Sequence, residues 1–316
     1  MTKAKNVILV GSTSVLAEYF YASCIHQYNF VNICRFNRSK NPIANCIDFD
    51  FSAEFNRDLF DDLLSSIRSS LVDSLETVLC LFAWAGTPRS SSDPASRLSI
   101  EHNNNIIISN FTFLAKSICP SQIFFLSSAG GLYDGSLNTI HTESSAPLPA
   151  SPYGIQKLTA ESLFASLAHD LSVPICIYRI SCAYGLNTRF PDQGVLNKWL
   201  FDGLVNGEIN IYNDLSSELN FISYDQISVA IEMGIDQDLN GIFNLGSCQS
   251  TSLSDIYRSV MELVPSIRSH HIDNSVRFLN IDCTKFEQAT GCIFEPLICH
   301  DAIKIFTKIR ESLMFK

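Results

Sequence analysis

The heptapeptide Ser151-Pro-Tyr-Gly-Ile-Gln-Lys157 contains the most informative pattern in this chain of 316 residues. Serine followed by proline often begins a helix, because the hydroxyl caps the first turn and proline fits the first helical position. Tyr153 and Lys157 then lie one turn apart on one face of that helix. Upstream, the apolar run Ile123-Phe-Phe-Leu126 predicts a buried strand, which ends in the hydroxyls of Ser127 and Ser128. The order of these two segments indicates an α/β fold with a polar site at a strand end.

The residue types at this strand end suit proton transfer to or from an alcohol or sugar oxygen. Free tyrosine has a pKa of about 10, too high for a base at neutral pH, and a nearby lysine ammonium lowers it. A serine hydroxyl can hydrogen-bond the same substrate oxygen and orient it. A Tyr-x-x-x-Lys pair also occurs on ordinary packed helices, so the surrounding sequence has to decide between the two interpretations.

Apolar runs alternate with amphipathic segments over the first half of the chain. We predict strands at residues 6–10, 31–34, 77–82, 123–126 and 173–178, and helices at residues 15–25, 55–72, 98–118 and 151–171. Because the strands are apolar throughout, they predict a Rossmann-like, doubly wound parallel sheet covered on both faces. Such sheets bind ligands beyond the carboxyl ends of their strands, where Gly11, Ala83 and Ser128 lie.

The regular alternation of predicted strands and helices ends beyond Tyr184, where Gly, Asn and Asp turns separate shorter elements. We therefore predict a dinucleotide-binding domain over residues 1–178. A smaller α/β lobe over residues 179–316 is expected to bind substrate, with some strand or helix exchanged back to the first domain.

Composition excludes several classes of partner. A net charge of −10 and a pI of about 5.1 argue against nucleic acid. The eleven cysteines are scattered without a Cys-x-x-Cys pair, which predicts reduced thiols and no metal site. No apolar stretch reaches the ~18 residues of a membrane span, and the N-terminus lacks the shape of a signal peptide. We expect a cytoplasmic protein without a membrane partner.

The first predicted strand runs into a turn that suits a dinucleotide pyrophosphate at a helix N-terminus. The predicted cofactor-binding residues of this turn are Gly11, Ser12, Thr13, Ser14 and Val15. A full Gly-x-Gly-x-x-Gly pattern is absent here.

The end of the second strand suggests which dinucleotide binds. An acidic residue that would accept hydrogen bonds from the adenosine ribose is missing there, and Arg35 and Arg38 stand nearby. Arginines can pair with a 2′-phosphate, which favours NADP while leaving NAD as the second choice. A solvated basic turn is the alternative. Asp48 and Phe49 are expected beside the adenine.

Together these segments resemble the extended short-chain dehydrogenase/reductase family, which includes nucleotide-sugar epimerases, dehydratases and 4-keto reductases. The resemblance extends over almost the whole chain, and it is carried by residues 78–88, 124–133, 151–161 and 179–185. It implies that Ser128, 25 residues before Tyr153, joins Tyr153 and Lys157 as the catalytic set, with Lys157 also holding the nicotinamide ribose. It further implies that Ala83 and Trp84 lie beside the cofactor. The substrate-binding residues that it implies are Thr87, Asn105, Ser127, Cys182, Gln193 and Arg277.

The sequence departs from the family pattern at some substrate positions. Cys182 replaces an asparagine that helps to hold the sugar nucleotide's phosphates, and Leu219-Asn220 replaces an Arg-Asp pair whose arginine grips the pyrophosphate. Arg277 remains as a cation that can take over.

The resemblance implies an NAD(P)-dependent oxidoreductase acting at C4 of a nucleotide-linked hexose, in surface-polysaccharide sugar biosynthesis. A 4-epimerase and a 4-keto reductase both remain open. A non-catalytic dinucleotide sensor of the same fold is the alternative from another class. Relatives often dimerise through two helices of each subunit, including the one that carries the tyrosine, so a homodimer is expected.

Overall fold

The computed structural model describes residues 4–35, 46–87, 93–186, 193–296 and 298–314. The chain forms two compact units. The first comprises Met1–Leu132, Pro149–Tyr178 and Ser228–Ile242, and the second comprises Tyr133–Leu148, Arg179–Ile227 and Phe243–Lys316. One boundary between the units falls after residue 178, where the sequence placed the domain boundary. Residues 133–148 precede it but belong to the second unit, and residues 228–242 follow it but belong to the first.

The main sheet has seven strands in the order β11-β7-β5-β4-β1-β2-β3. The pairs β1–β2, β1–β4, β2–β3 and β4–β5 are all parallel. The strands are β1 (Asn6–Val10), β2 (Asn29–Cys34), β3 (Cys46–Asp48), β4 (Thr77–Leu81), β5 (Gln122–Ser128), β7 (Ile175–Ile180) and β11 (Gly241–Leu245). The predicted doubly wound α/β fold is confirmed.

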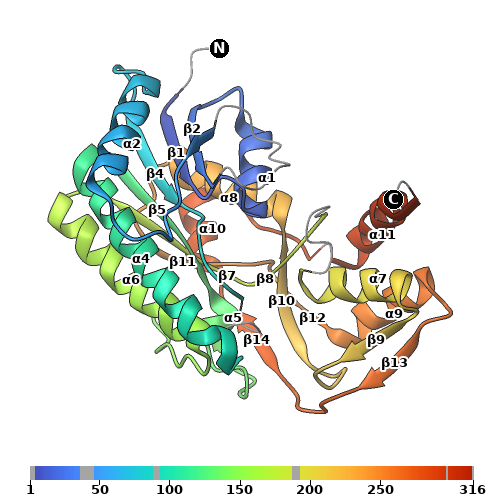
Figure 1. The fold of residues 1–316 in the computed structure, drawn as a ribbon. Helices are drawn as coiled ribbons and strands as arrows, with labels where there is room; N and C mark the ends of the chain where they lie inside the picture. The colour runs from blue at the N-terminus through green and yellow to red at the C-terminus, as the bar shows by residue number, and fades with distance from the viewer. Residues whose placement is uncertain (1–3, 36–45, 88–92, 187–192, 297, 315–316) are drawn as a thin grey trace. The chain divides into compact units, whose positions relative to one another are not determined.

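Helices cover both faces of this sheet (Figure 1). One layer contains α2 (Arg57–Ser70), α4 (Pro94–Ile118) and α6 (Pro152–Leu171), and the other contains α1 (Val15–Cys24) and α8 (Tyr224–Asp236). The first layer buries a continuous apolar core against the sheet, including Phe60, Phe111 and Phe164. Because burial on both faces requires apolar side chains at successive positions, β1 is buried at every residue.

Two helix starts show how the sequence sets the ends of these elements. Ser151 Oγ accepts a hydrogen bond from Gly154 N at 3.1 Å, so α6 begins where the Ser-Pro signal placed it. Helix α4 begins earlier than predicted, since Asp93 caps Ala95 N and Pro94 occupies the first helical position.

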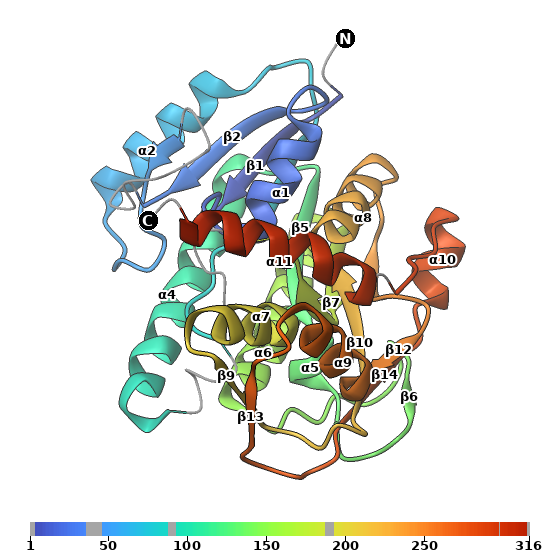
Figure 2. The same ribbon diagram turned by 90° about the vertical axis from the view of Figure 1, so that its right-hand side faces the viewer.

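The second unit holds a smaller mixed sheet in the order β12-β10-β14-β6, with β8 also paired to β10, and a two-stranded sheet of β9 and β13. Its strands are β6 (Ile140–His141), β8 (Cys182–Tyr184), β9 (Glu208–Ile211), β10 (Glu218–Ser223), β12 (Ser250–Ser252), β13 (Arg268–His271) and β14 (Phe278–Ile281). Figure 2 shows three helices of this unit packed together, α7 (Val195–Val205), α9 (Leu253–Leu263) and α11 (Ile298–Met314). The short helix α10 spans Thr284–Thr290.

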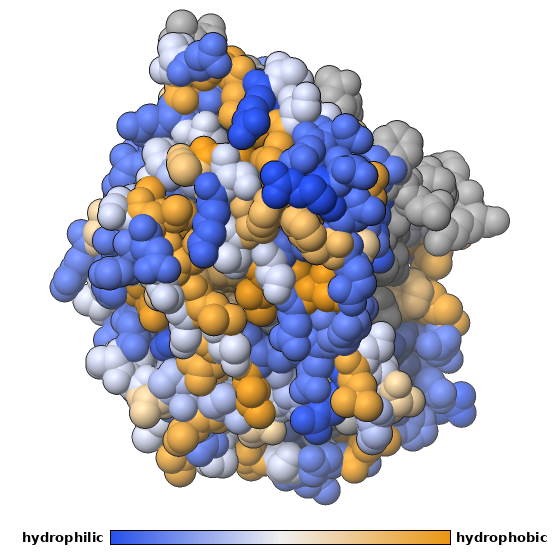
Figure 3. Space-filling view, turned by 60° about the vertical axis from the view of Figure 1, so that its left-hand side comes forward, coloured by the Kyte–Doolittle hydropathy of each residue, from blue (hydrophilic) through white to orange (hydrophobic). Residues whose placement is uncertain are grey.

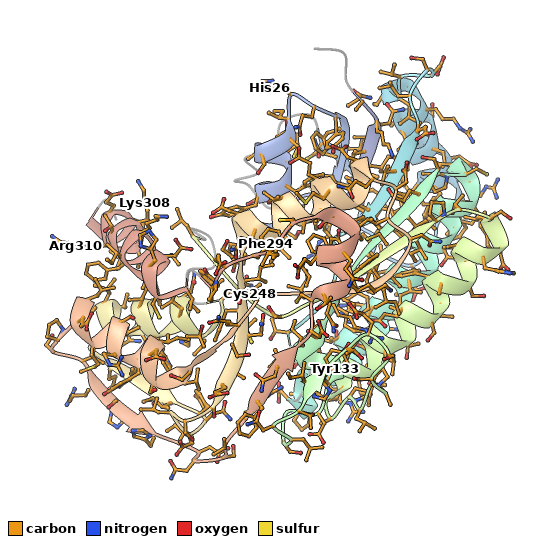
Figure 4. The ribbon with its side chains drawn as sticks, turned by 180° about the vertical axis from the view of Figure 1, so that it is seen from behind. His26, Tyr133, Cys248, Phe294, Lys308 and Arg310 are labelled. Carbon is orange, nitrogen blue, oxygen red and sulfur yellow. The ribbon has the colours of Figure 1, made fainter. Side chains whose placement is uncertain are left out.

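A buried polar cluster organises the second unit around Tyr133, which is labelled in Figure 4. The Tyr133 hydroxyl donates to Asn244 Oδ1 at 2.7 Å and accepts from Arg179 Nη1 at 3.0 Å. Its ring stacks on His141 with the centroids 4.7 Å apart. Tyr133 and Arg179 belong to two segments on which the family resemblance rests, and each hydrogen-bonds within this cluster.

Figure 3 shows hydrophobic and hydrophilic residues interspersed over one face of the molecule. This mixture is ordinary for a folded protein surface. Among the helices in the described part of the chain, none is both long and apolar enough to cross a membrane.

Candidate active site and dinucleotide pocket

Ser128 and Tyr153 meet at the carboxyl end of β5. Their side chains share a hydrogen bond, and Ser128 Oγ also accepts from Gly131 N at 3.2 Å. The Oγ of Ser127 is buried and has no hydrogen-bond partner among the described residues. Of the two adjacent serines, the structure therefore places Ser128 with the tyrosine.

Two glycines allow this close approach. The short helix α5 (Ala129–Leu132) packs on the first turn of α6. A Cβ at Gly154 would lie 1.9 Å from Gly131 O, and a Cβ at Gly131 would lie 3.2 Å from the Tyr153 ring carbons. A side chain at Gly154 would overlap the backbone of α5, and one at Gly131 would press on the Tyr153 ring.

Lys157 is 5% exposed and faces aromatic rings. Its Nζ donates to Leu126 O at 2.8 Å, and it lies 3.9 Å from the centroid of the Trp84 ring and 4.7 Å from that of Phe125. Burial lowers the pKa of Lys157 to about 7, and the Glu161 carboxylate one turn later opposes this shift.

The Tyr153 phenol differs from the sequence-based expectation. We expected the lysine ammonium to lower its pKa, yet burial raises the pKa of Tyr153 to about 12, and the hydrogen bond with Ser128 is what opposes that rise. The Lys157 Nζ is 5.9 Å from the centroid of the tyrosine ring and is oriented toward Leu126 O and Trp84. Lys157 has to move, or its surroundings have to become more polar, before it can stabilise a phenolate.

A cavity of about 170 Å³ lies beside this cluster in the same unit. Its lining residues come from the ends of β1, β2 and β4, the segment after β3, and α4. They are Gly11, Thr13, Ser14, Ile33, Cys34, Arg35, Phe49, Asp50, Phe51, Ser52, Phe82, Ala83, Trp84, Ala85, Asn103 and Ile107.

The glycine turn forms one wall of the cavity. Gly11 has φ +86°, and a Cβ there would lie 2.4 Å from Ala83 N, so only glycine lets these two strand ends come together. Ser14 caps α1 by accepting from Ala17 N at 3.2 Å, which leaves its own hydroxyl proton for a ligand. Ser12 is fully buried, and its Oγ donates to Ile33 O at 3.3 Å, so it supports the turn from behind.

Arg35 and Asp50 form an ion pair at the other end of the cavity. Arg35 Nη1 lies 3.5 Å from Asp50 Oδ2, and Asp50 Oδ1 accepts from Ser52 N at 2.9 Å and Ser52 Oγ at 2.6 Å. Phe49 lines the wall as expected for an adenine neighbour, while Asp48 is exposed and is not one of the lining residues.

The acid on the cavity wall is thus Asp50, two residues beyond the predicted Asp48. The sequence pointed to this segment through Asp48 and Phe49, but nothing in it indicated that Asp50, and not Asp48, lines the cavity. Arg38 lies outside the described residues.

Asn104, the neighbour of the predicted Asn105, is fully buried on α4 and bonds the segment after β4. Its Oδ1 accepts from Ala85 N at 2.8 Å, and its Nδ2 donates to Ala85 O at 3.1 Å and Gln156 Oε1 at 2.9 Å. Asn105 is exposed, because the buried face of α4 passes through 104, 107, 108 and 111. That apolar spacing was a signal that could have selected Asn104.

Two of the predicted substrate residues come together in the second unit. Burial raises the pKa of Cys182 to about 11, and the nearby Arg277 guanidinium opposes that rise. A Cβ at Gly135 would lie 2.9 Å from Arg277 Nε, so the glycine makes room for the arginine. Gln193 precedes α7 in this unit, while Thr87 is exposed beyond β4 in the first unit.

The residues in the first unit fit a dinucleotide. The tight glycine turn and the capped helix suit a pyrophosphate, the Phe49 ring suits a base, and Arg35 and Asp50 suit a ribose with or without a phosphate. Within the described residues, no group of three or more His, Cys, Asp or Glu side chains is arranged to hold a metal ion.

A sequence model of the NAD dependent epimerase/dehydratase family matches residues 26–246. The chain belongs to this family. The resemblance to nucleotide-sugar epimerases and dehydratases is thereby confirmed.

Individual members of the family are similar at low identity. A trifunctional UDP-glucose 4,6-dehydratase/UDP-4-keto-6-deoxy-D-glucose 3,5-epimerase/UDP-4-keto-L-rhamnose-reductase of Arabidopsis thaliana is 21% identical over 277 residues, 83% of this chain. The match covers 40% of that plant protein, so the chain spans well under half of its length.

Two solved structures share the fold. UDP-glucose 4-epimerase of Thermotoga maritima, solved with UDP-glucose, has a TM-score of 0.80 at 17% identity, and the match covers 98% of this chain and 99% of that one. UDP-glucuronic acid 4-epimerase of Bacillus cereus, in complex with UDP-glucuronic acid and NAD, has a TM-score of 0.80 at 16% identity, covering 97% and 99% of the two chains.

Proposed function

We propose that this protein is an NAD(P)-dependent nucleotide-sugar oxidoreductase that acts at C4 of a hexose, as a 4-epimerase or a 4-keto reductase of surface-polysaccharide sugar biosynthesis. One observation carries the proposal: Ser128, Tyr153 and Lys157 gather at the end of β5, in the same unit as a cavity that fits a dinucleotide. The plant relative with reductase activity in its name and the two 4-epimerase structures support both versions.

The three side chains divide the work of proton transfer. Tyr153 gives a proton to the C4 oxygen or takes one from it, and the Ser128 hydroxyl orients that oxygen. Lys157 supplies positive charge that stabilises the phenolate and holds the nicotinamide ribose. When bound, the nicotinamide supplies or accepts the hydride at C4.

Other residues are proposed to hold the two ligands. On the cofactor side these are the turn from Gly11 to Val15, Arg35, Phe49, Ala83 and Trp84. The proposed substrate residues are Thr87, Ser127, Cys182, Gln193 and Arg277, with Asn104 in place of Asn105 as the asparagine that supports the site through Ala85. Arg277 is the proposed cation for the sugar nucleotide's diphosphate.

Arg35 favours NADP, because its guanidinium can pair with a 2′-phosphate. Asp50 offers NAD an acceptor for ribose hydroxyls from the same wall, so NAD is the second choice. Comparing NADH and NADPH affinities of the wild type, Arg35→Ala and Asp50→Ala separates the two. If the protein prefers NADP, Arg35→Ala weakens NADPH binding about tenfold and leaves NADH binding nearly unchanged. If Asp50→Ala instead weakens NADH binding and Arg35→Ala leaves NADPH binding unchanged, the protein prefers NAD.

Turnover assays test the activity itself. A 4-keto reductase consumes NADPH with a UDP- or dTDP-linked 4-keto hexose, whereas a 4-epimerase interconverts two hexoses without net cofactor consumption. Tyr153→Phe should lose at least 100-fold in kcat in either case, because the proton-transfer group is gone. Exposed Tyr212 provides the control, since Tyr212→Phe should retain activity.

The runner-up is a non-catalytic dinucleotide sensor. It predicts that wild type and Tyr153→Phe are equally inert with every nucleotide sugar while both bind the dinucleotide. That result would replace the enzymatic proposal.

We also propose a cytoplasmic homodimer. The outer faces of α4 and α6 expose apolar side chains at Leu98, Ile155 and Leu163, of which Ile155 and Leu163 lie two turns apart on α6. Light scattering of the wild type and of Ile155→Asp should give a dimer and a monomer respectively. Cell fractionation tests the location.

A further inference from the structure

The Trp84 indole is the nearest aromatic ring to the Lys157 ammonium. Lys157 Nζ lies 3.9 Å from the centroid of the Trp84 ring, closer than to the rings of Phe125 at 4.7 Å or Tyr153 at 5.9 Å. Lys157 Nζ donates one of its three protons to Leu126 O. Aromatic faces therefore take the place of water around a buried cation.

We propose that Trp84 is a positioning residue that keeps the buried Lys157 ammonium charged at the end of β5, which is the form in which it can act on Tyr153. The inference rests on the proposed function for its catalytic meaning, although the contact itself can be tested without turnover.

Electrostatics explains why an indole stands at this position. Burial disfavours the charged form of Lys157, and Trp84 presents the aromatic face that attracts cations most strongly. The charged group that acts on Lys157 is Glu161 of its own helix, and the titratable Tyr153 of the same helix lies on its other side. From β5 it meets Leu126 O and the Phe125 ring, and from the segment after β4 it meets Trp84, none of which titrates.

The indole is held in place by means other than its own hydrogen bond. Trp84 Nε1 is buried without a partner in the described structure, and the ring packs on Phe125 with the centroids 5.9 Å apart. The two hydrogen bonds from Asn104 to Ala85 fix the backbone next to it. Among the described residues, the Trp84 ring meets the Lys157 ammonium and the Phe125 ring.

Fluorine NMR of the full chain labelled with 5-fluorotryptophan tests the contact directly. The protein has two tryptophans, Trp84 and Trp199, and Trp84→Phe assigns their two signals. We expect the Trp84 signal to shift with a midpoint near pH 7, where Lys157 titrates, while the Trp199 signal stays constant. In Lys157→Met, the transition should vanish. A Trp84 signal that does not titrate between pH 5 and 10, or that titrates unchanged in Lys157→Met, would overturn the proposal.

The pH profile of turnover tests the consequence. Trp84→Leu removes the ring, so the alkaline limb of kcat/KM should move about one pH unit lower, and Trp84→Phe should move it less. The ratio of activity at pH 6 to activity at pH 8 should therefore be higher in Trp84→Leu than in the wild type. A merely structural role would lower activity equally at both pH values. If no nucleotide sugar is turned over and the NMR transition still depends on Lys157, the proposed function fails while the contact stands.

Discussion

The contact between α5 and α6 predicts whether Gly154→Ala stabilises or destabilises the protein, and helix propensity predicts the opposite direction. Alanine is about 1 kcal/mol better than glycine in a helix interior, so propensity alone predicts that Gly154→Ala stabilises the protein. The structure predicts the opposite. A Cβ at this position would lie 1.9 Å from Gly131 O and 2.9 Å from Pro149 Cβ, where ordinary contacts begin near 3.4 Å.

Relieving that overlap requires α5 and α6 to separate by more than 1 Å. Overpacking of this kind costs about 1 to 3 kcal/mol or more, which outweighs the helix gain. We expect a net loss of about 2 kcal/mol in the free energy of unfolding, and a Tm lower by about 5 °C. Since Tyr153 directly precedes Gly154 and pairs with Ser128 across the same contact, kcat should fall more than tenfold.

Thermal and urea unfolding measure this effect, with Ser162→Ala on the exposed face of α6 as the matched control. Ser162→Ala should change the free energy of unfolding by less than about 0.5 kcal/mol. A Gly154→Ala protein that is as stable as the wild type, or more stable, would show that the two helices are not in the contact described.

Three further predictions concern the same unit. Gly131→Ala should lower kcat about tenfold with little loss of stability, because a Cβ 3.2 Å from the Tyr153 ring displaces it by only a few tenths of an ångström; an unchanged kcat would contradict this. Asn104→Ala should cost about 1 to 3 kcal/mol in urea unfolding, because both backbone groups of Ala85 lose their partner, whereas Asn105→Ala should cost less than about 0.5 kcal/mol. Lys157 has a folded pKa of about 7, below its unfolded value, so the unfolded chain binds more protons between pH 7 and 10 and wild-type stability rises there. Lys157→Met should be more stable than wild type at pH 7, on the order of 1–2 kcal/mol, with the difference shrinking toward pH 10, and a pH-independent difference would count against this account.

The fold could be predicted because its signals are local. The predicted helix over residues 55–72 contains the observed α2, Arg57–Ser70, and the strand over residues 6–10 coincides with β1. Strand β3, Cys46–Asp48, was not predicted, since three residues are too few to show a period. It pairs with β2 at the edge of the sheet, and the segment after it carries Asp50.

The site was predictable where its residues lie close together in sequence. Tyr153 and Lys157 share a helix, and Ser128 ends the preceding strand, so spacing alone suggested a common site. The partners of Lys157 depend on tertiary structure. Trp84 follows β4 and reaches Lys157 only because β4 and β5 are neighbours in the sheet, and nothing in the sequence near Trp84 indicates that contact.

The Arg35–Asp50 pair changes how the cofactor question should be posed. From sequence, the basic turn after β2 and the missing acid both favoured a 2′-phosphate. In the structure the arginine is accompanied by an acid from the segment after β3, and both side chains are partly exposed. Such an ion pair contributes at most about 1 kcal/mol, so a phosphate that engages the guanidinium through two hydrogen bonds can displace Asp50. A ribose hydroxyl would instead bind Asp50 and leave the pair intact. Cofactor preference therefore depends on whether the Arg35–Asp50 ion pair opens, so Asp50 matters as much as Arg35. If the phosphate competes with the carboxylate, Asp50→Asn should strengthen NADPH binding. If the carboxylate holds the ribose, Asp50→Asn should weaken NADH binding.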